Sequence, residues 1–254
     1  MRAGQNLQRF FVDPGSITDS SITFSQGISH QISQVLRLDL NQDEVIVLDG
    51  RGAAYVARLS GKSGRTVTAE IIEKLEGNNA ESVDLTLCFS LTRREKVEWI
   101  LQKCTEIGVS RFQPYVSERS VSRLDSLEET RRLRWQSIIR EAAEQSECSR
   151  LPDLLEVVSF DVILGEHSRE AQALIAYEGA NATNTLWQIS LKRTSTILLI
   201  GPEGGFSDNE AEKAIRSGFQ PFSLGKRILR METACMVASA LVLDRLDAIE
   251  VNCD

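Results

Sequence analysis

The spacing of hydrophobic and polar positions indicates two differently built regions. In residues 1–76, short apolar segments are separated by glycine turns, and apolar and polar positions alternate within 44–48, 53–59 and 65–72. Such alternation predicts half-buried strands, and glycine turns between them are typical of antiparallel hairpins. This region is therefore predicted to form a small antiparallel β-barrel, with a helix over 29–38 lying against it.

From residue 83 the pattern changes, and apolar runs alternate with helical segments. The runs 84–89, 173–177 and 196–200 are short and almost wholly apolar, as expected of buried strands in a parallel sheet. A long helix is predicted over about 127–146. The alternation of strands and helices predicts an α/β domain with a mainly parallel sheet.

A polar segment, 77–81, has no hydrophobic pattern and separates the two regions. Domain boundaries usually fall in such exposed polar linkers. We therefore predict two domains, residues 1–76 and 77–254.

Helix start and stop signals occur at four positions in the second region. Thr92–Glu95 and Ser207–Glu210 fit capping boxes, in which a hydroxyl and a carboxylate satisfy free backbone N–H groups. Gly108 is expected to end the helix that begins at the first capping box, and Gly218 the helix that begins at the second. An apolar face is predicted for two helices, formed by Val97, Ile100, Leu101, Cys104 and Ile107 in the first and by Ala234, Val237, Ala238, Leu241, Val242 and Ile249 in the last.

The composition, 42% hydrophobic and 26% charged, is that of an ordinary globular protein. No stretch approaches the roughly 18 apolar residues of a membrane span, and the N-terminus lacks the apolar region of a signal peptide. We therefore expect a cytoplasmic protein. The five cysteines form no CxxC pair, and His30 and His167 are the only histidines, which argues against a metal site and for reduced thiols.

The net charge of −7 is unfavourable for binding a nucleic acid, but the charge is unevenly distributed. Residues 90–140 contain 11 Lys and Arg against 7 Asp and Glu, a local charge of +4, which leaves −11 for the rest of the chain. This basic stretch is compatible with a local RNA contact and equally with a solvated helical surface.

The segment 197–206 is a predicted buried strand that opens into a Gly-rich turn before a capped helix. Ligands of open α/β sheets bind beyond the carboxyl ends of the strands, and Gly201, Gly204 and Gly205 would allow the backbone to approach a ligand closely. The segment has neither the Gly-Lys-Ser/Thr of a P-loop nor the GxGxxG of a dinucleotide site. The pattern alone leaves open whether this is a ligand loop or a tight structural turn.

The Gly-rich segment is followed by Pro221–Ala234 (PFSLGKRILRMETA), where a second strand is predicted to end at Leu224-Gly225 before the last helix. Together with IGPEGG at 200–205, this segment resembles the RsmE family of methyltransferases, members of the SPOUT superfamily. Shorter matches extend the resemblance, in order, over essentially the whole chain: Arg9-Phe-Phe11, His30, Val35-Leu-Arg37, Lys96, Gln102-Lys103, Glu106-Ile-Gly-Val109, Ser117-Glu-Arg-Ser120 and Glu141-Ala-Ala-Glu-Gln-Ser146. The family often has Gly-Arg where this chain has Glu147-Cys148, and Thr in place of Met231.

The resemblance implies an N-terminal PUA-like β-barrel and a SPOUT domain whose C-terminus forms a trefoil knot. It also implies a homodimer that uses S-adenosyl-L-methionine to methylate N3 of a uridine in 16S ribosomal RNA, in the assembled small ribosomal subunit. Two alternatives remain, a SPOUT methyltransferase acting on another RNA base and a non-catalytic ribosome-binding factor. Carried over by position, the cofactor-binding residues are Tyr177, Glu178, Leu199, Ile200, Gly201, Gly205, Ser223, Leu224, Gly225, Ile228, Leu229 and Arg230.

Methylation at N3 requires removal of a proton from uracil, for which a carboxylate and a cation are suitable groups. Arg230 and Glu232 beside the cofactor loops are the candidate catalytic residues. Alternatively, Glu232 favours the helix N-terminus and pairs with Arg230. Glu203 is interpreted as a loop brace and His30 as RNA-facing or structural. The candidate RNA-binding residues are Arg9, Arg93, Arg94, Lys103, Arg119 and Arg123, of which Arg119 could instead pair with a nearby acid.

Overall fold

The computed structural model describes residues 7–75, 83–120, 129–166, 171–179, 185–192 and 195–251. The described residues up to 75 form one compact unit together with Ala143–Leu151, and the others form a second unit. The segment 77–81, where the domain boundary is predicted, lies outside the described residues.

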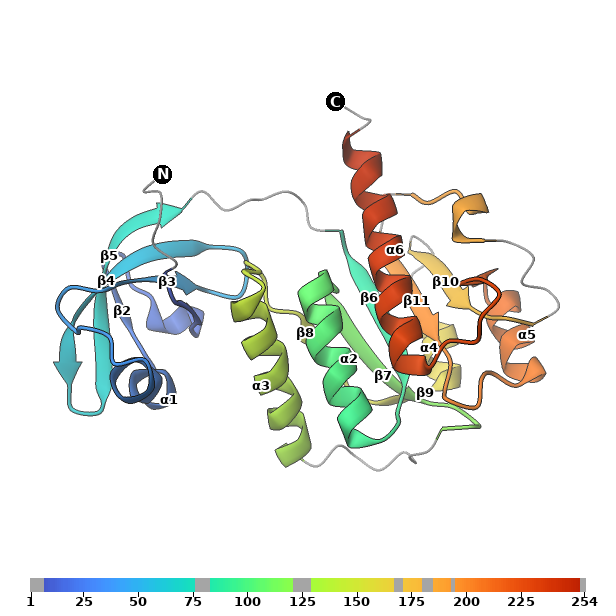
Figure 1. The fold of residues 1–254 in the computed structure, drawn as a ribbon, viewed down its shortest axis with the longest axis horizontal. Coiled ribbons are helices and arrows are strands. Elements are labelled where there is room, and N and C mark those ends of the chain that lie inside the picture. The colour runs from blue at the N-terminus through green and yellow to red at the C-terminus, as the bar shows by residue number, and fades with distance from the viewer. Residues whose placement is uncertain are drawn as a thin grey trace. The chain divides into compact units, whose positions relative to one another are not determined.

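The first unit is built on a five-stranded sheet with the order β1-β3-β4-β5-β2 (Figure 1). Its strands are β1 (Arg9–Phe11), β2 (Ser21–Thr23), β3 (Glu44–Leu48), β4 (Ala54–Ser63) and β5 (Thr66–Leu75). The sheet is mixed rather than purely antiparallel, because β1 pairs with β3 in parallel. Register shifts in the β4–β5 pair are the kind of irregularity that bends strands.

A helical segment covers the core of the first unit. It comprises α1 (Gln26–His30) and a π-helical turn, η2 (Gln31–Val35). It starts three residues before the predicted helix, because the Ser25 side chain caps it by accepting the N–H of Ile28 at 3.4 Å. A short 3₁₀ turn, η1 (Pro14–Ser16), follows β1.

The end of α3 (Glu129–Gln145) belongs to the first unit, where Ala143 is buried beside Phe11 and Leu48. The N–H of Cys148 donates to the carbonyl of Ala143, five residues earlier, at 3.0 Å. In a Schellman motif this is the hydrogen bond that joins the two residues further apart in the sequence. Glu147 occupies the left-handed position of that motif, with φ +61°. A glycine is preferred there, which explains why the similar family often has one. The Glu147 carboxylate accepts from Arg9 at 2.9 Å.

The second unit contains a seven-stranded sheet in which the paired strands run parallel, as the apolar runs predicted. The strand order is β12-β10-β11-β6-β7-β8, and β9 also pairs with β7. The bounds are β6 (Leu85–Ser90), β7 (Arg111–Val116), β8 (Asp153–Leu154), β9 (Val158–Ser159), β10 (Gln172–Ala176), β11 (Thr196–Ile200) and β12 (Gln220–Phe222).

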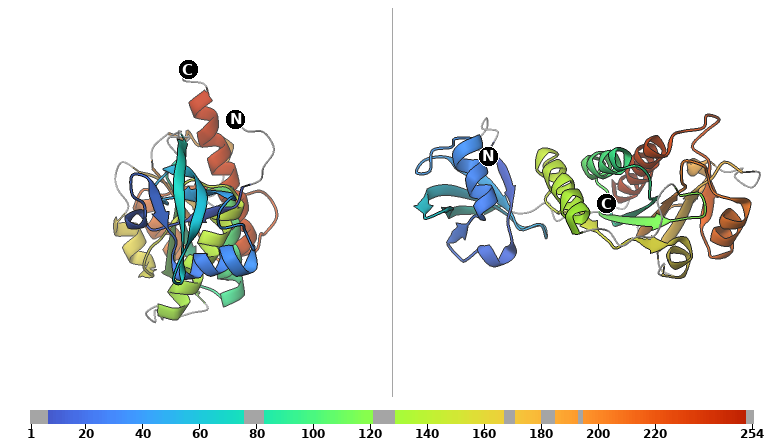
Figure 2. Two further views of the ribbon diagram at one scale, coloured as in Figure 1. Left: turned by 90° about the vertical axis from the view of Figure 1, so that its left-hand side faces the viewer. Right: turned by 90° about the horizontal axis from the view of Figure 1, so that it is seen from below.

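Helices cover both faces of this sheet (Figure 2). On one face, α2 (Arg94–Ile107) packs against α6 (Met231–Val251), which also contacts β6 and β11. On the other face, α4 (Phe160–Glu166) and α5 (Asp208–Arg216) share a core cluster with side chains of the strands. A 3₁₀ turn, η3 (Leu186–Gln188), precedes β11.

The predicted capping box at Ser207 is present, but the one at Thr92 is wrong. Ser207 and Glu210 cap α5 reciprocally. Helix α2 begins at Arg94 with Arg93 as its N-cap, and no side chain caps it. The Thr92 hydroxyl instead donates to the carboxylate of Glu203. Gly108, with φ +109°, ends α2 as predicted.

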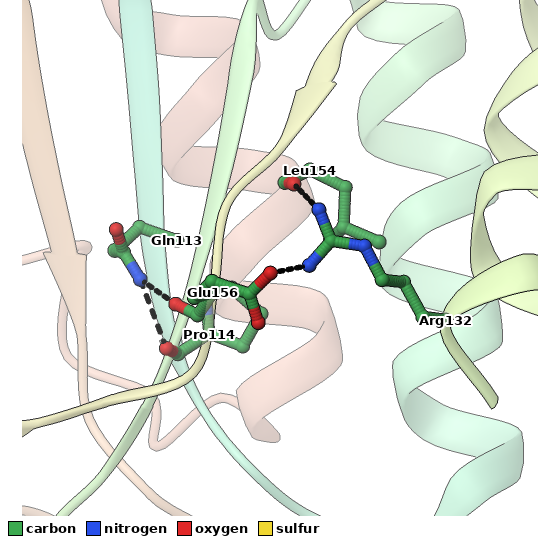
Figure 3. A network of polar contacts seen from close by, with 5 residues as sticks. All are labelled: Gln113, Pro114, Arg132, Leu154 and Glu156. Atoms are coloured by element: carbon green, nitrogen blue, oxygen red, sulfur yellow. Dashed lines mark hydrogen bonds and ion pairs between the residues drawn. The ribbon is translucent and has the colours of Figure 1, made fainter. Parts of the chain in front are cut away.

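A polar network fixes the edge of the sheet at β7 (Figure 3). Arg132 of α3 binds the Glu156 carboxylate and donates to the Leu154 carbonyl at 3.5 Å. Gln113 of β7 donates to the backbone carbonyl of Glu156 at 2.5 Å. These contacts hold the short strands β8 and β9 against β7.

The buried face of α6 is rotated from the predicted one. Cys235, Ala238, Val242 and Leu246 are fully buried. Of the predicted stripe, Ala234, Val237, Leu241 and Ile249 remain half-buried. Helix α6 follows β12, which lies at the edge of the sheet, and it packs against the central strands β6 and β11. The trefoil knot stays a prediction.

The described cysteines are free thiols, as expected. Burial raises the pKa of Cys88 and of Cys104 to about 12, so both stay protonated at neutral pH. Among the described residues, no helix is long and apolar enough to cross a membrane, and no group of three or more potential ligands could hold a metal ion.

Candidate active site

Three neighbouring strands end at the same level and open onto a pocket. In the parallel register, Ala176 at the end of β10 pairs with Ile200 of β11 and with Phe222 of β12. The loops that follow these strands and the start of α6 enclose a cavity of about 190 Å³. The pocket is lined by Ala176, Tyr177, Glu178, Gly179, Ile200, Gly201, Pro202, Glu203, Gly205, Phe206, Leu224, Ile228, Leu229, Met231 and Ala234.

Most of the predicted cofactor-binding residues line this pocket: Tyr177, Glu178, Ile200, Gly201, Gly205, Leu224, Ile228 and Leu229. Leu199 does not, because successive strand residues point to opposite faces, and its side chain is buried in the core beneath α4 and α5. Ser223 closes the turn behind Leu224, where its hydroxyl accepts the N–H of Gly225 at 3.1 Å. Gly225 and Arg230 belong to the same loop and are exposed.

The glycines of the site have different physical roles. Gly205 and Gly225 have φ +68° and +116°, conformations that other residues adopt only with strain, and a Cβ at either would meet no neighbour within 4 Å. Gly201 is constrained by packing instead. A Cβ there would lie 2.9 Å from the ring of Phe206, which packs with Phe160 in the core.

Sequence reasoning missed the polar cluster beside the pocket, because its members come from three distant segments. Lys96 on α2 places its Nζ 3.3 Å from Oε1 of Glu203 in the Gly-rich loop and 3.4 Å from Oε2 of Glu232 on α6. Glu203 also accepts from the Thr92 hydroxyl. Lys96 is one of the shorter matches to the similar family, and that match was the only sequence signal that pointed to the cluster.

The hydrogen bond from Thr92 holds the pKa of Glu203 below its usual range, and Lys96 adds to this effect. Glu203 is therefore ionised at neutral pH and braces the Gly-rich loop against α2, in agreement with its interpretation from sequence. Glu232 pairs with Lys96 rather than with Arg230. Its side chain is 12% exposed, and its Oε2 makes no hydrogen bond.

A second brace reaches the Gly-rich loop from the segment after β7. The guanidinium of Arg119 donates to the Gly204 carbonyl at 3.1 Å, so its partner is a backbone carbonyl and not the acid considered from sequence. The buried Tyr115 hydroxyl donates to the Ile200 carbonyl at 2.8 Å. The N–H of Glu118 donates to Glu210 on α5 at 2.9 Å. The loop is thereby held from the segment after β7 as well as from the start of α2.

The other candidate RNA-binding residues differ in their surroundings. Arg94 and Lys103 pair with Glu98 and Glu106 on α2, and Arg9 pairs with Glu147. Arg93 is exposed, and Arg123 lies outside the described residues.

Comparisons with known proteins give a consistent result. The family model for the RNA methyltransferase domain matches residues 79–243. The chain is 35% identical over 239 residues to the ribosomal RNA small subunit methyltransferase E of Synechocystis sp., covering 92% of this chain and 76% of that protein. It is 30% identical to the protein of the same name from Bacillus subtilis, covering 93% and 96%.

Solved structures agree with this result over nearly the whole chain. The crystal structure of a ribosomal RNA small subunit methyltransferase E from Neisseria gonorrhoeae, bound to S-adenosyl methionine, superposes with a TM-score of 0.84 at 30% identity. The superposition covers 94% of this chain and 98% of that one.

Proposed function

The chain belongs to the ribosomal RNA small subunit methyltransferase E family of RNA methyltransferases, and we propose that it transfers a methyl group from S-adenosyl-L-methionine to N3 of a uridine in 16S ribosomal RNA. The observation that carries the proposal is the pocket at the aligned ends of β10, β11 and β12. Met231 and Ala234, which lie on either side of Glu232 in the first turn of α6, line this pocket. The N3 position comes from the family resemblance.

The pocket fits such a cofactor chemically. Its walls are mostly apolar, with Ile200, Leu224, Leu229 and Met231 available for a flat base and ribose. The backbone of Gly201 and Gly205 offers polar groups without side-chain volume. A volume of about 190 Å³ is below the roughly 300 Å³ of a typical complete ligand site, so part of the cofactor would lie at the open mouth beside Gly225 and Ile228.

S-adenosyl-L-methionine, when bound, supplies a methyl group on a positively charged sulfur, which keeps the electron pair of the broken C–S bond. The protein has to orient the uracil ring and to accept the N3 proton, which leaves the N3 electron pair free to form the new N–C bond. We assign proton acceptance to Glu232. Arg230, exposed in the loop just before α6, would stabilise negative charge on the flanking carbonyl oxygens of uracil.

Exposed basic residues beside the pocket support an RNA contact on this side of the second unit. Arg93 and Arg119 flank the segments that carry Lys96 and the Gly-rich loop. The surface pair Arg94–Glu98 contributes little free energy, so Arg94 could exchange its carboxylate partner for a phosphate. The assembled small subunit remains the proposed substrate, in line with the family resemblance.

The half-buried positions of α6 support a homodimer. Val237 and Leu241 follow helical spacing on a face that the monomer covers only partly. A second copy would cover them, and light scattering at micromolar concentration would then give twice the 28.3 kDa chain mass.

Calorimetric titration with S-adenosyl-L-methionine tests the cofactor assignment directly. Saturable binding at one site per chain is expected. A chain that binds no cofactor would favour the alternative of a non-catalytic ribosome-binding factor.

A further inference from the structure

Three segments far apart in the sequence bring one lysine between two glutamates. Lys96 lies in the first turn of α2, Glu203 in the loop between β11 and α5, and Glu232 in the first turn of α6. Both carboxylates lie within 3.4 Å of the same Nζ. A single ammonium therefore compensates two carboxylates, and the cluster carries a net charge of −1.

The two carboxylates are held unequally. Glu203 accepts from Thr92 as well as pairing with Lys96, and hydrogen bonds to a carboxylate stabilise its charged form. Glu232 is 12% exposed, and its Oε2 has the ammonium as its ionic partner but accepts no hydrogen bond. A carboxylate with fewer donors accepts a proton more readily, because it gives up fewer interactions.

We propose that Lys96 is a positioning residue that holds Glu203 and Glu232 on one ammonium group and thereby leaves Glu232 as the carboxylate that takes the N3 proton. This inference rests on the proposed function. Lys96 aims the Glu232 carboxylate before the base arrives. Once the proton has moved, Glu232 is neutral and the ammonium remains neutralised by Glu203, so no uncompensated charge is left.

The charges around this cluster come from each element packed on it. Arg93, at the N-cap of α2, also lowers the pKa of Glu203. On α6, burial raises the pKa of the Cys235 thiol, and the charge of Glu232 adds to that shift, so this thiol is neutral. Arg230 precedes α6 and is exposed. Lys96 is the cation paired with both carboxylates in the described residues.

The first test is the pH dependence of methyl transfer by Lys96→Met, with Lys96→Arg as the conservative variant. Without the ammonium, two neighbouring carboxylates repel each other and the pair takes up a proton at higher pH. The acidic limb of the rate profile should move up by about 1–2 pH units. Because an ordinary glutamate titrates near pH 4.3, the rate should fall about 2- to 10-fold near pH 5.5, recover towards neutral pH, and be largely restored by Lys96→Arg.

Lys213→Met provides the matched control, because Lys213 is a surface lysine on α5, paired with Asp161 at 3.2 Å. Its profile should match that of the unmodified chain. A rate for Lys96→Met that is reduced by the same factor at every pH would overturn the proposal, since a purely structural loss does not depend on protonation.

The second test does not require activity. Lys96→Met should lower the melting temperature at neutral pH by several degrees, because the two carboxylates then face each other without a cation. Adding Glu232→Gln to Lys96→Met removes that repulsion and should raise the melting temperature again. Equal melting temperatures for the single and double variants would overturn the pairing. A chain that shows the predicted melting pattern but methylates no RNA would refute the proposed function alone.

Discussion

Thr92 donates its hydroxyl hydrogen to the carboxylate of Glu203, a residue 111 positions further along the chain. This hydrogen bond joins the end of β6 to the Gly-rich loop after β11 and helps to keep Glu203 ionised. It therefore connects the conformation of a pocket wall to the start of α2.

Glu203→Gln should lower stability in a pH-dependent way. The folded-state pKa of Glu203 lies below its ordinary value of 4.5, so ionised Glu203 contributes stability that is fully present above that value. That contribution is lost as the pH falls through the folded-state pKa. Thermal melts should show the variant less stable at pH 7, with the difference narrowing below about pH 4. A difference that is constant across this range would contradict the ionic role.

Gly225→Val and Gly201→Val should act differently on binding and stability. Val at Gly225 is strained by φ +116° and should displace the loop that carries Leu224, which weakens S-adenosyl-L-methionine binding about tenfold or more with little loss of melting temperature. Val at Gly201 collides with the Phe206 ring. It should weaken cofactor binding and, in addition, lower the free energy of unfolding by about 1–3 kcal/mol.

Gly61→Val is the control for backbone strain. Gly61 has φ +132° in β4, a Cβ there would meet no atom within 4 Å, and the residue lies outside the pocket lining. Calorimetry and thermal melts on the three variants separate the effects. Unchanged cofactor affinity in Gly225→Val would disprove this placement of the loop.

Glu147→Gly should stabilise the first unit by about 0.5–1 kcal/mol. The left-handed backbone at φ +61° costs a non-glycine residue about 1 kcal/mol, whereas an ion pair as exposed as Arg9–Glu147 contributes less. Glu147→Ala keeps the strain and loses the pair, so it should be slightly destabilised. Urea unfolding of both variants measures the difference, and a Glu147→Gly protein less stable than Glu147→Ala would show that the pair dominates.

Arg93→Ala and Arg119→Ala should each weaken RNA binding across sequences and flatten its salt dependence by about one unit of log–log slope. Arg119→Ala should also weaken cofactor binding slightly, because its guanidinium supports the Gly204 carbonyl. Arg216→Ala, an exposed arginine paired with Glu212 on α5, is the control. Filter binding at several salt concentrations measures the slopes, and an unchanged slope for Arg119→Ala would leave only its bracing role.

Local patterns predicted the elements that carry a signal in their own residues. The apolar runs ending at Tyr177 and Ile200 identified β10 and β11, because a strand buried on both faces has little polar character. Ser207 was correctly identified as a cap because its partner, Glu210, is three residues away. Thr92 has the same spacing to Glu95, yet its partner is Glu203, which no local pattern reveals.

The same limit applies to the site. The Gly-rich loop and the Leu224 loop were assigned to the site through the family resemblance, which depends on contiguous motifs, and residues of both loops line the pocket. The pairing of Glu232 with Lys96 was missed because it depends on how α2 packs against α6. The rotation of the buried face of α6 toward Cys235 and Leu246 likewise depends on the neighbouring helix and strands.

The most direct test of the central claim is to locate the methyl group. Small ribosomal subunits whose 16S ribosomal RNA lacks N3-methyluridine are incubated with the protein and S-adenosyl-L-methionine, and the RNA is analysed by nucleoside mass spectrometry and reverse transcription. We predict N3-methyluridine at a single position, which stops reverse transcriptase because N3 lies on the pairing edge, and a rate at least about 100-fold lower with Glu232→Gln. A methyl group on another base or on a ribose, or no methylation at all, would contradict the account.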